Sequence, residues 1–269
     1  MKSISHTYNR LLRLFQFEQR FPTLLILPQV DRLILNNDPT LGEVVNLCES
    51  NSTLFAKLTK TQHGNEDLRQ FAKDILLKKG MSYLQSICIR AMNQEIFVLP
   101  LGLIDGLTET VLKRRSIILA RYLKLFHSEL SVLPDDAYLC GLFYNFRLVC
   151  FELLAESEAL GSDNFELEEE EVSCALGASF RNLGFNNKIC TFIENAAKEI
   201  YSTEHPSFHA ICRIGNQMIT NSDQTGSTTF RNTSFIEPKL LEVTGLSLRE
   251  IVDPMKEVVK DFKGGTNRQ

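Results

Sequence analysis

Apolar residues recur at intervals of three and four along nearly the whole chain, and this periodicity limits the possible folds more than any other feature. Such spacing places apolar side chains on one face of a helix, whereas a half-buried strand needs strict alternation, which no segment shows convincingly. At 269 residues the chain also exceeds the length that one core usually serves. The sequence therefore predicts an all-α fold, a multi-helix bundle with two closely packed helical lobes.

Prolines, glycines and capping residues divide this pattern into separate helices. Thr40–Glu43 and Ser247–Glu250 have the spacing of a capping box, and Glu168–Glu171 places acidic side chains where a helix begins. We expect a connector over 22–28 and an interruption of the last helix at Pro254. The other predicted helices cover residues 11–19, 30–35, 52–58, 68–79, 107–130, 134–151, 187–201 and 208–220.

These helices group into a predicted domain organisation. Residues 1–105 form an N-terminal helical lobe and residues 106–221 a second helical lobe. Residues 222–235 are polar and lack apolar periodicity, which predicts a loop, and 236–269 hold the C-terminal helices and a tail.

Charge and composition exclude several classes of protein. The net charge of −4 gives no overall electrostatic attraction for a phosphate backbone, so nucleic acid is an unfavourable partner. The basic run Lys113–Arg115 is expected to be a solvated helix face. The start of the chain lacks the apolar core of a secretory signal, and no segment is long enough to span a bilayer. The seven cysteines are scattered singly, as expected of reduced core residues. We therefore expect a cytoplasmic protein without membrane contact.

Several short segments have a characteristic order and spacing over residues 14–220. They are Phe21–Pro28, Asn51–Leu58, Arg115–Ala120, Gly141–Leu148, Glu171–Ala178 and Asn182–Asn186. In this order they resemble the HDOD family, an offshoot of the HD metal-dependent phosphohydrolases that occurs in bacterial signalling proteins. The resemblance implies an HD-like bundle with 106–221 as its HD-like lobe.

The residues that give the HD superfamily its chemistry are replaced in this sequence. The resemblance assigns Arg115, Tyr144 and Ser173 to family histidines, Asn145 to the aspartate and Arg147 to a following glycine, and a later family His-His pair falls near Ala196–Ala197. An HD hydrolase holds its cations with imidazoles and carboxylates. Arginine repels a cation, and asparagine, tyrosine and serine are poor ligands at neutral pH. We therefore expect no metal, no cofactor and no catalysis.

Other catalytic motifs receive little support. No phosphate-binding glycine loop, GxSxG elbow or HExxH helix occurs. His205 and His209 have a spacing of four, which would suit a metal if both lay on one helix face, but a flexible surface turn is the favoured interpretation. Cys140 and Cys150 lie in an apolar helix without a nearby histidine, which argues against a catalytic thiol.

The sequence leaves three functional hypotheses, of which a non-catalytic signalling module that binds a regulatory protein is preferred. The alternatives are a divergent metal-dependent phosphohydrolase with a site built from His205, His209 and nearby acidic residues, and a sensor that binds a small anionic ligand in the vacated pocket. That pocket is predicted to be lined by Arg115, Tyr144, Asn145, Arg147 and Ser173. A simpler interpretation is that Arg115 pairs with an acidic neighbour and Tyr144 fills the space of the lost histidine.

Overall fold

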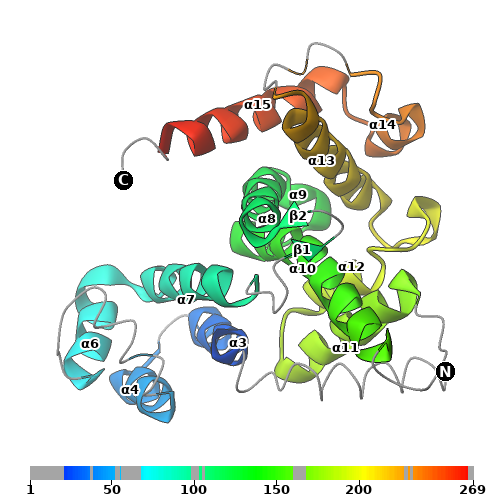
Figure 1. Ribbon diagram of the computed structural model, residues 1–269. Helices are drawn as coiled ribbons and strands as arrows, with labels where there is room; N and C mark the ends of the chain where they lie inside the picture. The colour runs from blue at the N-terminus through cyan, green and yellow to red at the C-terminus, as the bar shows by residue number, and fades with distance from the viewer. Residues whose placement is uncertain are drawn as a thin grey trace. The chain divides into compact units, whose positions relative to one another are not determined.

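The computed structural model describes residues 21–36, 39–51, 55, 68–97, 103–104, 107–159, 168–226, 230 and 233–265. Its helices are coloured along the chain in Figure 1. The predicted helix over 11–19, and most of that over 52–58, lie outside the described residues.

The described residues form an all-α protein in which helices pack into bundles. The only strands in the described part of the chain are two-residue segments, β1 (Leu103–Ile104) and β2 (Leu107–Thr108), which pair antiparallel. The chain divides into two compact units. We call the described residues up to 97, together with 182–185, the N-terminal unit, and the described residues 103–181 and 186–265 the C-terminal unit. No helix among the described residues is long and apolar enough to cross a membrane.

The N-terminal unit consists of short helices. They are α3 (Pro22–Leu35), α4 (Leu41–Ser50), α6 (Leu68–Asp74), the π-helical turn η1 (Ile75–Lys79) and α7 (Met81–Glu95). Helix α3 packs against α7, and α4 packs against α6. Two polar contacts join α3 to α7: the Thr23 amide donates to Glu95 at 3.1 Å, and the Gln85 amide donates to Asp31 at 2.7 Å.

The predicted connector over 22–28 is wrong, because α3 runs through it without a break. Pro22 occupies the first turn, where its missing N–H has no helical partner to lose. Pro28 lies inside the helix and forfeits one backbone hydrogen bond. Leu24, Leu27 and Val30 are all fully buried, so packing of this apolar face outweighs that loss.

The C-terminal unit contains the longer helices. They are α8 (Glu109–Lys124), α9 (His127–Leu130), α10 (Pro134–Ala159), α11 (Glu169–Leu183), α12 (Asn187–Glu194), the 3-10 turn η2 (Ile200–Ser202), α13 (Pro206–Thr225), α14 (Pro238–Thr244) and α15 (Leu248–Gly265). Figure 1 shows α13 and α15 in brown and red near the end of the chain. The last residues of α11, 182–183, belong to the N-terminal unit.

Helix α8 packs against α10, α13 and α15, and two glycines set how closely its neighbours approach. A Cβ atom on Gly141 of α10 would lie 2.6 Å from the Ala120 Cα of α8. A Cβ on Gly215 of α13 would lie 2.8 Å from the ring of Tyr122. The Tyr122 hydroxyl donates to the Ile251 carbonyl of α15 at 3.2 Å. Helix α8 is therefore the central element of this unit.

Both predicted capping boxes are present. Thr40 accepts a hydrogen bond from the Glu43 amide at 3.3 Å, and the Glu43 carboxylate accepts from the Thr40 amide at 2.8 Å. Ser247 and Glu250 make the same pair of contacts at 3.3 and 2.8 Å. The hydrogen bonds from Thr40 hold the pKa of the Glu43 carboxyl below its usual value. These local signals are confirmed because each depends on a few neighbouring residues.

Several helix ends differ from the prediction in the C-terminal unit. The helix predicted over 107–130 is broken, because α8 ends at Lys124 and α9 starts at His127. Helix α12 is shorter than the helix predicted over 187–201. Helix α13 runs to Thr225 and ends at Gly226, whose φ of 67° suits only glycine well, so the first residues of the predicted polar loop are helical.

Helix α15 continues through Pro254, which contradicts the predicted interruption. Proline removes one N–H from the ladder, but a buried face spans the site. Ile251 and Met255 are fully buried, and Val259 is 4% exposed. As in α3, burial of an apolar face holds a helix together across a proline.

Candidate functional site

Tyr144 and Arg147 lie one turn apart on α10 and form the buried part of the candidate site. Tyr144 is 6% exposed and Arg147 is 8% exposed. The Arg147 guanidinium carbon lies 4.8 Å from the centre of the Tyr144 ring, and Arg147 Nη1 donates to Glu169 Oε2 at 2.5 Å. Glu169 lies in the first turn of α11, where the predicted acidic run meets the free amides of the helix. The structure therefore gives one of these acidic residues a cationic partner on a second helix.

The protonation states of this pair follow from burial and charge. Burial raises the pKa of Tyr144 above its ordinary value, although Arg147 opposes the shift, so the phenol is neutral at physiological pH. Burial by itself lowers the pKa of Arg147, but Tyr144 and Glu169 outweigh it, so its pKa is raised. With a neutral phenol, Glu169 provides the negative charge that stabilises the guanidinium.

Tyr144 and Arg147 line an open cavity of about 310 Å³, which we call the arginine cavity. Helices α10, α11 and α13 and the residues that follow α12 contribute its walls. Its lining residues are Tyr144, Arg147, Glu169, Ala196, Ala197, Arg213, Asn216 and Gln217. The small side chains of Ala196 and Ala197 lie near the place where the resemblance puts a His-His pair. Tyr144, which the resemblance assigns to a family histidine, borders the same cavity.

Arg213, Asn216 and Gln217 of the arginine cavity were missed by the sequence reasoning. All three lie on α13, whose helix had been predicted without a role in the site. Arg213 donates through Nη2 to the Lys198 carbonyl, which orients the guanidinium. One signal pointed to it: Arg213 stands between Cys212 and Ile214, and an arginine among the buried positions of a helix often serves a specific contact.

The cavity lining does not include Asn145 or Ser173, the other two predicted residues of α10 and α11. Asn145 is 2% exposed and Ser173 is fully buried. Among the described residues, neither Asn145 Nδ2 nor Ser173 Oγ has a hydrogen-bond partner. An unpaired buried donor costs about 1–3 kcal/mol, so these two polar groups weaken the packing around α10 and α11.

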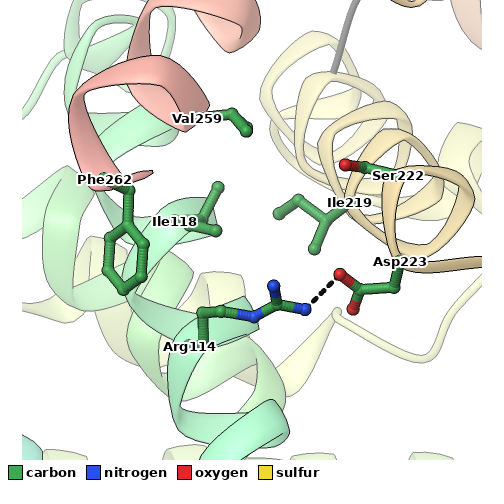
Figure 2. Close-up of a pocket in the computed structure, with 7 residues that line it drawn as sticks. All are labelled: Arg114, Ile118, Ile219, Ser222, Asp223, Val259 and Phe262. Carbon is green, nitrogen blue, oxygen red and sulfur yellow. Dashed lines mark hydrogen bonds and ion pairs between the residues drawn. The ribbon is translucent and has the colours of Figure 1, made fainter. Parts of the chain in front are cut away.

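Arg115 lies outside the arginine cavity and pairs with an acidic neighbour, as the simpler interpretation held. Its Nε donates to Asp223 Oδ2 at 2.6 Å, and Arg114 Nη2 contacts Asp223 Oδ1. Figure 2 shows Arg114 directed at Asp223 beside Ile118, Ile219 and Phe262. This second cavity of about 20 Å³ has room for about one water molecule.

The same ion pairs correct the prediction that Lys113–Arg115 forms a solvated face. The Arg115 side chain is 14% exposed and that of Arg114 is 36% exposed, because both turn toward α13. Sequence spacing could not indicate this, since Asp223 was placed in a loop.

Of the two spaced histidines, His205 lies in a partly exposed bend and His209 does not. His205 precedes the first turn of α13, and His209 lies within the helix at 2% exposure, with its ring stacked on Phe192 at 4.5 Å. Burial, with smaller contributions from Arg213 and His205, lowers the pKa of His209 to about 3. The interpretation of this pair as a flexible surface turn is therefore wrong for His209. Among the described residues, no group of three or more His, Cys, Asp or Glu side chains is placed to hold a metal ion.

The cysteines lie in the core as free thiols. Six are buried and Cys174 is half-buried. Burial raises the pKa of Cys88 to about 12 and that of Cys190 to about 11, which keeps both thiols protonated.

Comparison with known proteins adds no relative. No protein-family model, no curated protein and no solved structure matches the chain.

Proposed function

We propose that this chain is a non-catalytic binding module of the HDOD type that acts in bacterial signal transduction, in the cytoplasm, by contact with a regulatory protein. One observation carries the proposal. Tyr144 and Ala196–Ala197 are distant in sequence, yet all border the arginine cavity. The resemblance assigns Tyr144 to a family histidine and places a later His-His pair near Ala196–Ala197. A helical fold descended from a metal enzyme would keep such positions together after losing the ligands. Arg115, Asn145 and Ser173, which the resemblance also assigns to ligand positions, do not line this cavity.

The chemistry of the arginine cavity supports binding rather than metal-dependent hydrolysis. Two guanidinium groups, Arg147 and Arg213, lie in its walls and would repel a divalent cation. Its one carboxylate, Glu169, pairs with Arg147 at 2.5 Å and is therefore a poor candidate for a metal ligand. The neutral phenol of Tyr144 and the methyl groups of Ala196 and Ala197 cannot replace imidazole ligands.

Metal analysis and a hydrolysis assay test this proposal. The purified protein is expected to carry less than stoichiometric iron, manganese or zinc, and to leave phosphomonoesters and phosphodiesters intact when Mn²⁺ or Fe²⁺ is added. The variants His205→Asn and His209→Asn provide the comparison. Hydrolysis that needs a metal and disappears in either variant would contradict the proposal and favour the divergent phosphohydrolase.

Partner binding requires a second measurement. A protein captured from the native host should form a complex of defined stoichiometry with the purified chain, measured by sedimentation velocity with both components pure. Its affinity should be the same with EDTA present, because no metal contributes to the binding surface. Failure of every captured protein to bind the purified chain directly would refute the partner-binding role.

A further inference from the structure

We infer that the arginine cavity binds a small hydroxylated organic anion, held through a phosphate or carboxylate group by Arg213 and Arg147. This inference deepens the proposed function, because it rests on the cavity being free of metal and gives the module a ligand that could regulate it.

The charges in the cavity favour an anion. Its lining contains two arginines and one glutamate, Glu169, and arginine remains protonated at every physiological pH. Glu169 is already paired with Arg147 and its side chain is 49% exposed. Among the described residues, no carboxylate pairs with Arg213, whose guanidinium donates to the neutral Lys198 carbonyl. The lining thus holds one positive charge in excess. Arg213 carries it, because no carboxylate of the described residues pairs with its guanidinium.

Two lining residues each carry a buried polar atom that lacks a hydrogen-bond partner among the described residues. Arg147 Nε is buried and makes no hydrogen bond to the described residues, although Nη1 of the same group contacts Glu169. Gln217 Oε1 is likewise unpaired, while Gln217 Nε2 donates to Glu237 at 3.2 Å. A buried donor or acceptor without a partner is unfavourable, so either side chain gains a hydrogen bond if it turns this atom toward a ligand in the cavity.

These two atoms define complementary features of the ligand. Arg147 Nε is a donor and suits an oxyanion, which guanidinium groups bind through paired, charge-assisted hydrogen bonds. Gln217 Oε1 is an acceptor and suits a hydroxyl group on the same ligand. Asn216 adds an amide that can donate or accept. A ligand with one anionic group and at least one hydroxyl satisfies both unpaired atoms.

The volume limits the size of this ligand. At about 310 Å³ the arginine cavity lies at the lower end of the range for small-molecule sites. Ala196 and Ala197 leave this space open, whereas the longer side chains that the resemblance places there would occupy part of it. The cavity therefore suits a ligand of metabolite size, such as a sugar or polyol phosphate or a hydroxy acid.

Calorimetric titration of the full-length chain in EDTA tests the inference with three probes: inorganic phosphate, glycerol 3-phosphate and glycerate. At least one hydroxylated probe should bind with a dissociation constant of about 1 mM or lower, and more tightly than inorganic phosphate. Tighter binding of glycerol 3-phosphate would identify a phosphate ligand, and tighter binding of glycerate a carboxylate ligand. No binding of any probe up to about 10 mM would overturn the inference.

Matched variants locate the binding. Arg213→Met should weaken binding about tenfold or more, because a charge-assisted pair is lost. Arg249→Met removes the same charge from the C-terminal unit, where the Arg249 side chain is 90% exposed, and should bind like the parent. Ala197→Glu, which places a carboxylate in the cavity without removing any contact of Arg213, should abolish binding. Equal affinity in the parent and a folded Arg213→Met or Ala197→Glu variant would overturn the inference.

The EDTA condition separates this inference from the proposed function. Binding that appears only when Mn²⁺ is added would overturn both, because the cavity would then be a metal site. Absence of binding with and without Mn²⁺ would overturn the ligand site and leave the non-catalytic module standing.

Discussion

Replacing Gly141 by alanine tests the close packing of α8 on α10, which positions Tyr144 and Arg147. The new Cβ would lie 2.6 Å from the Ala120 Cα, 2.7 Å from the Ala120 nitrogen and 2.9 Å from the Leu119 carbonyl carbon. All three atoms belong to backbone and cannot rotate away, so the two helices must separate. Overpacking of this kind costs about 1–3 kcal/mol, and alanine returns up to about 1 kcal/mol in helix propensity.

The expected net effect is a loss of about 1–2 kcal/mol in the free energy of unfolding. Urea unfolding followed by far-ultraviolet circular dichroism measures it, with the slope against urea as a check that the unfolded state is unchanged. Gly42→Ala is the matched control. A Cβ there has Thr40 Oγ1 as its nearest neighbour at 3.9 Å, so this change should be neutral or slightly stabilising. A Gly141→Ala variant as stable as the parent would refute the close approach of the helices.

Two further predictions concern charge. The pKa of His209 is about 3 in the folded protein and 6.5 for a free histidine. Between pH 6.5 and pH 3 the unfolded chain therefore binds more protons than the folded protein, and the free energy of unfolding falls as the pH falls. Between pH 6.5 and 5 the parent should lose about 1.5 kcal/mol, and a His209→Gln variant, measured by urea unfolding at each pH, should lose much less. Asp223→Asn leaves Arg114 and Arg115 without their anion and should lower the free energy of unfolding by about 1–3 kcal/mol. Asp253→Asn removes an exposed ion pair and should lower it by less than about 1 kcal/mol. Equal urea midpoints for these two aspartate variants would contradict the structural role of Asp223.

The candidate site was predicted from sequence in part. The resemblance pointed to Tyr144 and Arg147, and both lie in the lining of the arginine cavity. It also grouped Arg115 with them, but the partner of Arg115 is Asp223, 108 positions away in the chain. Nothing in local spacing indicates which of several acidic residues will face an arginine on another helix. Arg213 was missed for the same reason, since its role depends on the helix that it faces.

The sequence by itself determined the helical class of this protein and the local signals at its helix ends. Apolar periodicity and the boxes at Thr40–Glu43 and Ser247–Glu250 act over a few residues, so they can be recognised without knowledge of the fold. Tertiary structure decided where helices continue and which polar residues meet. Helices α3 and α15 pass through Pro28 and Pro254 because their apolar faces are buried by distant parts of the chain. The composition of the arginine cavity has the same origin, because contacts between helices depend on packing that local sequence does not encode.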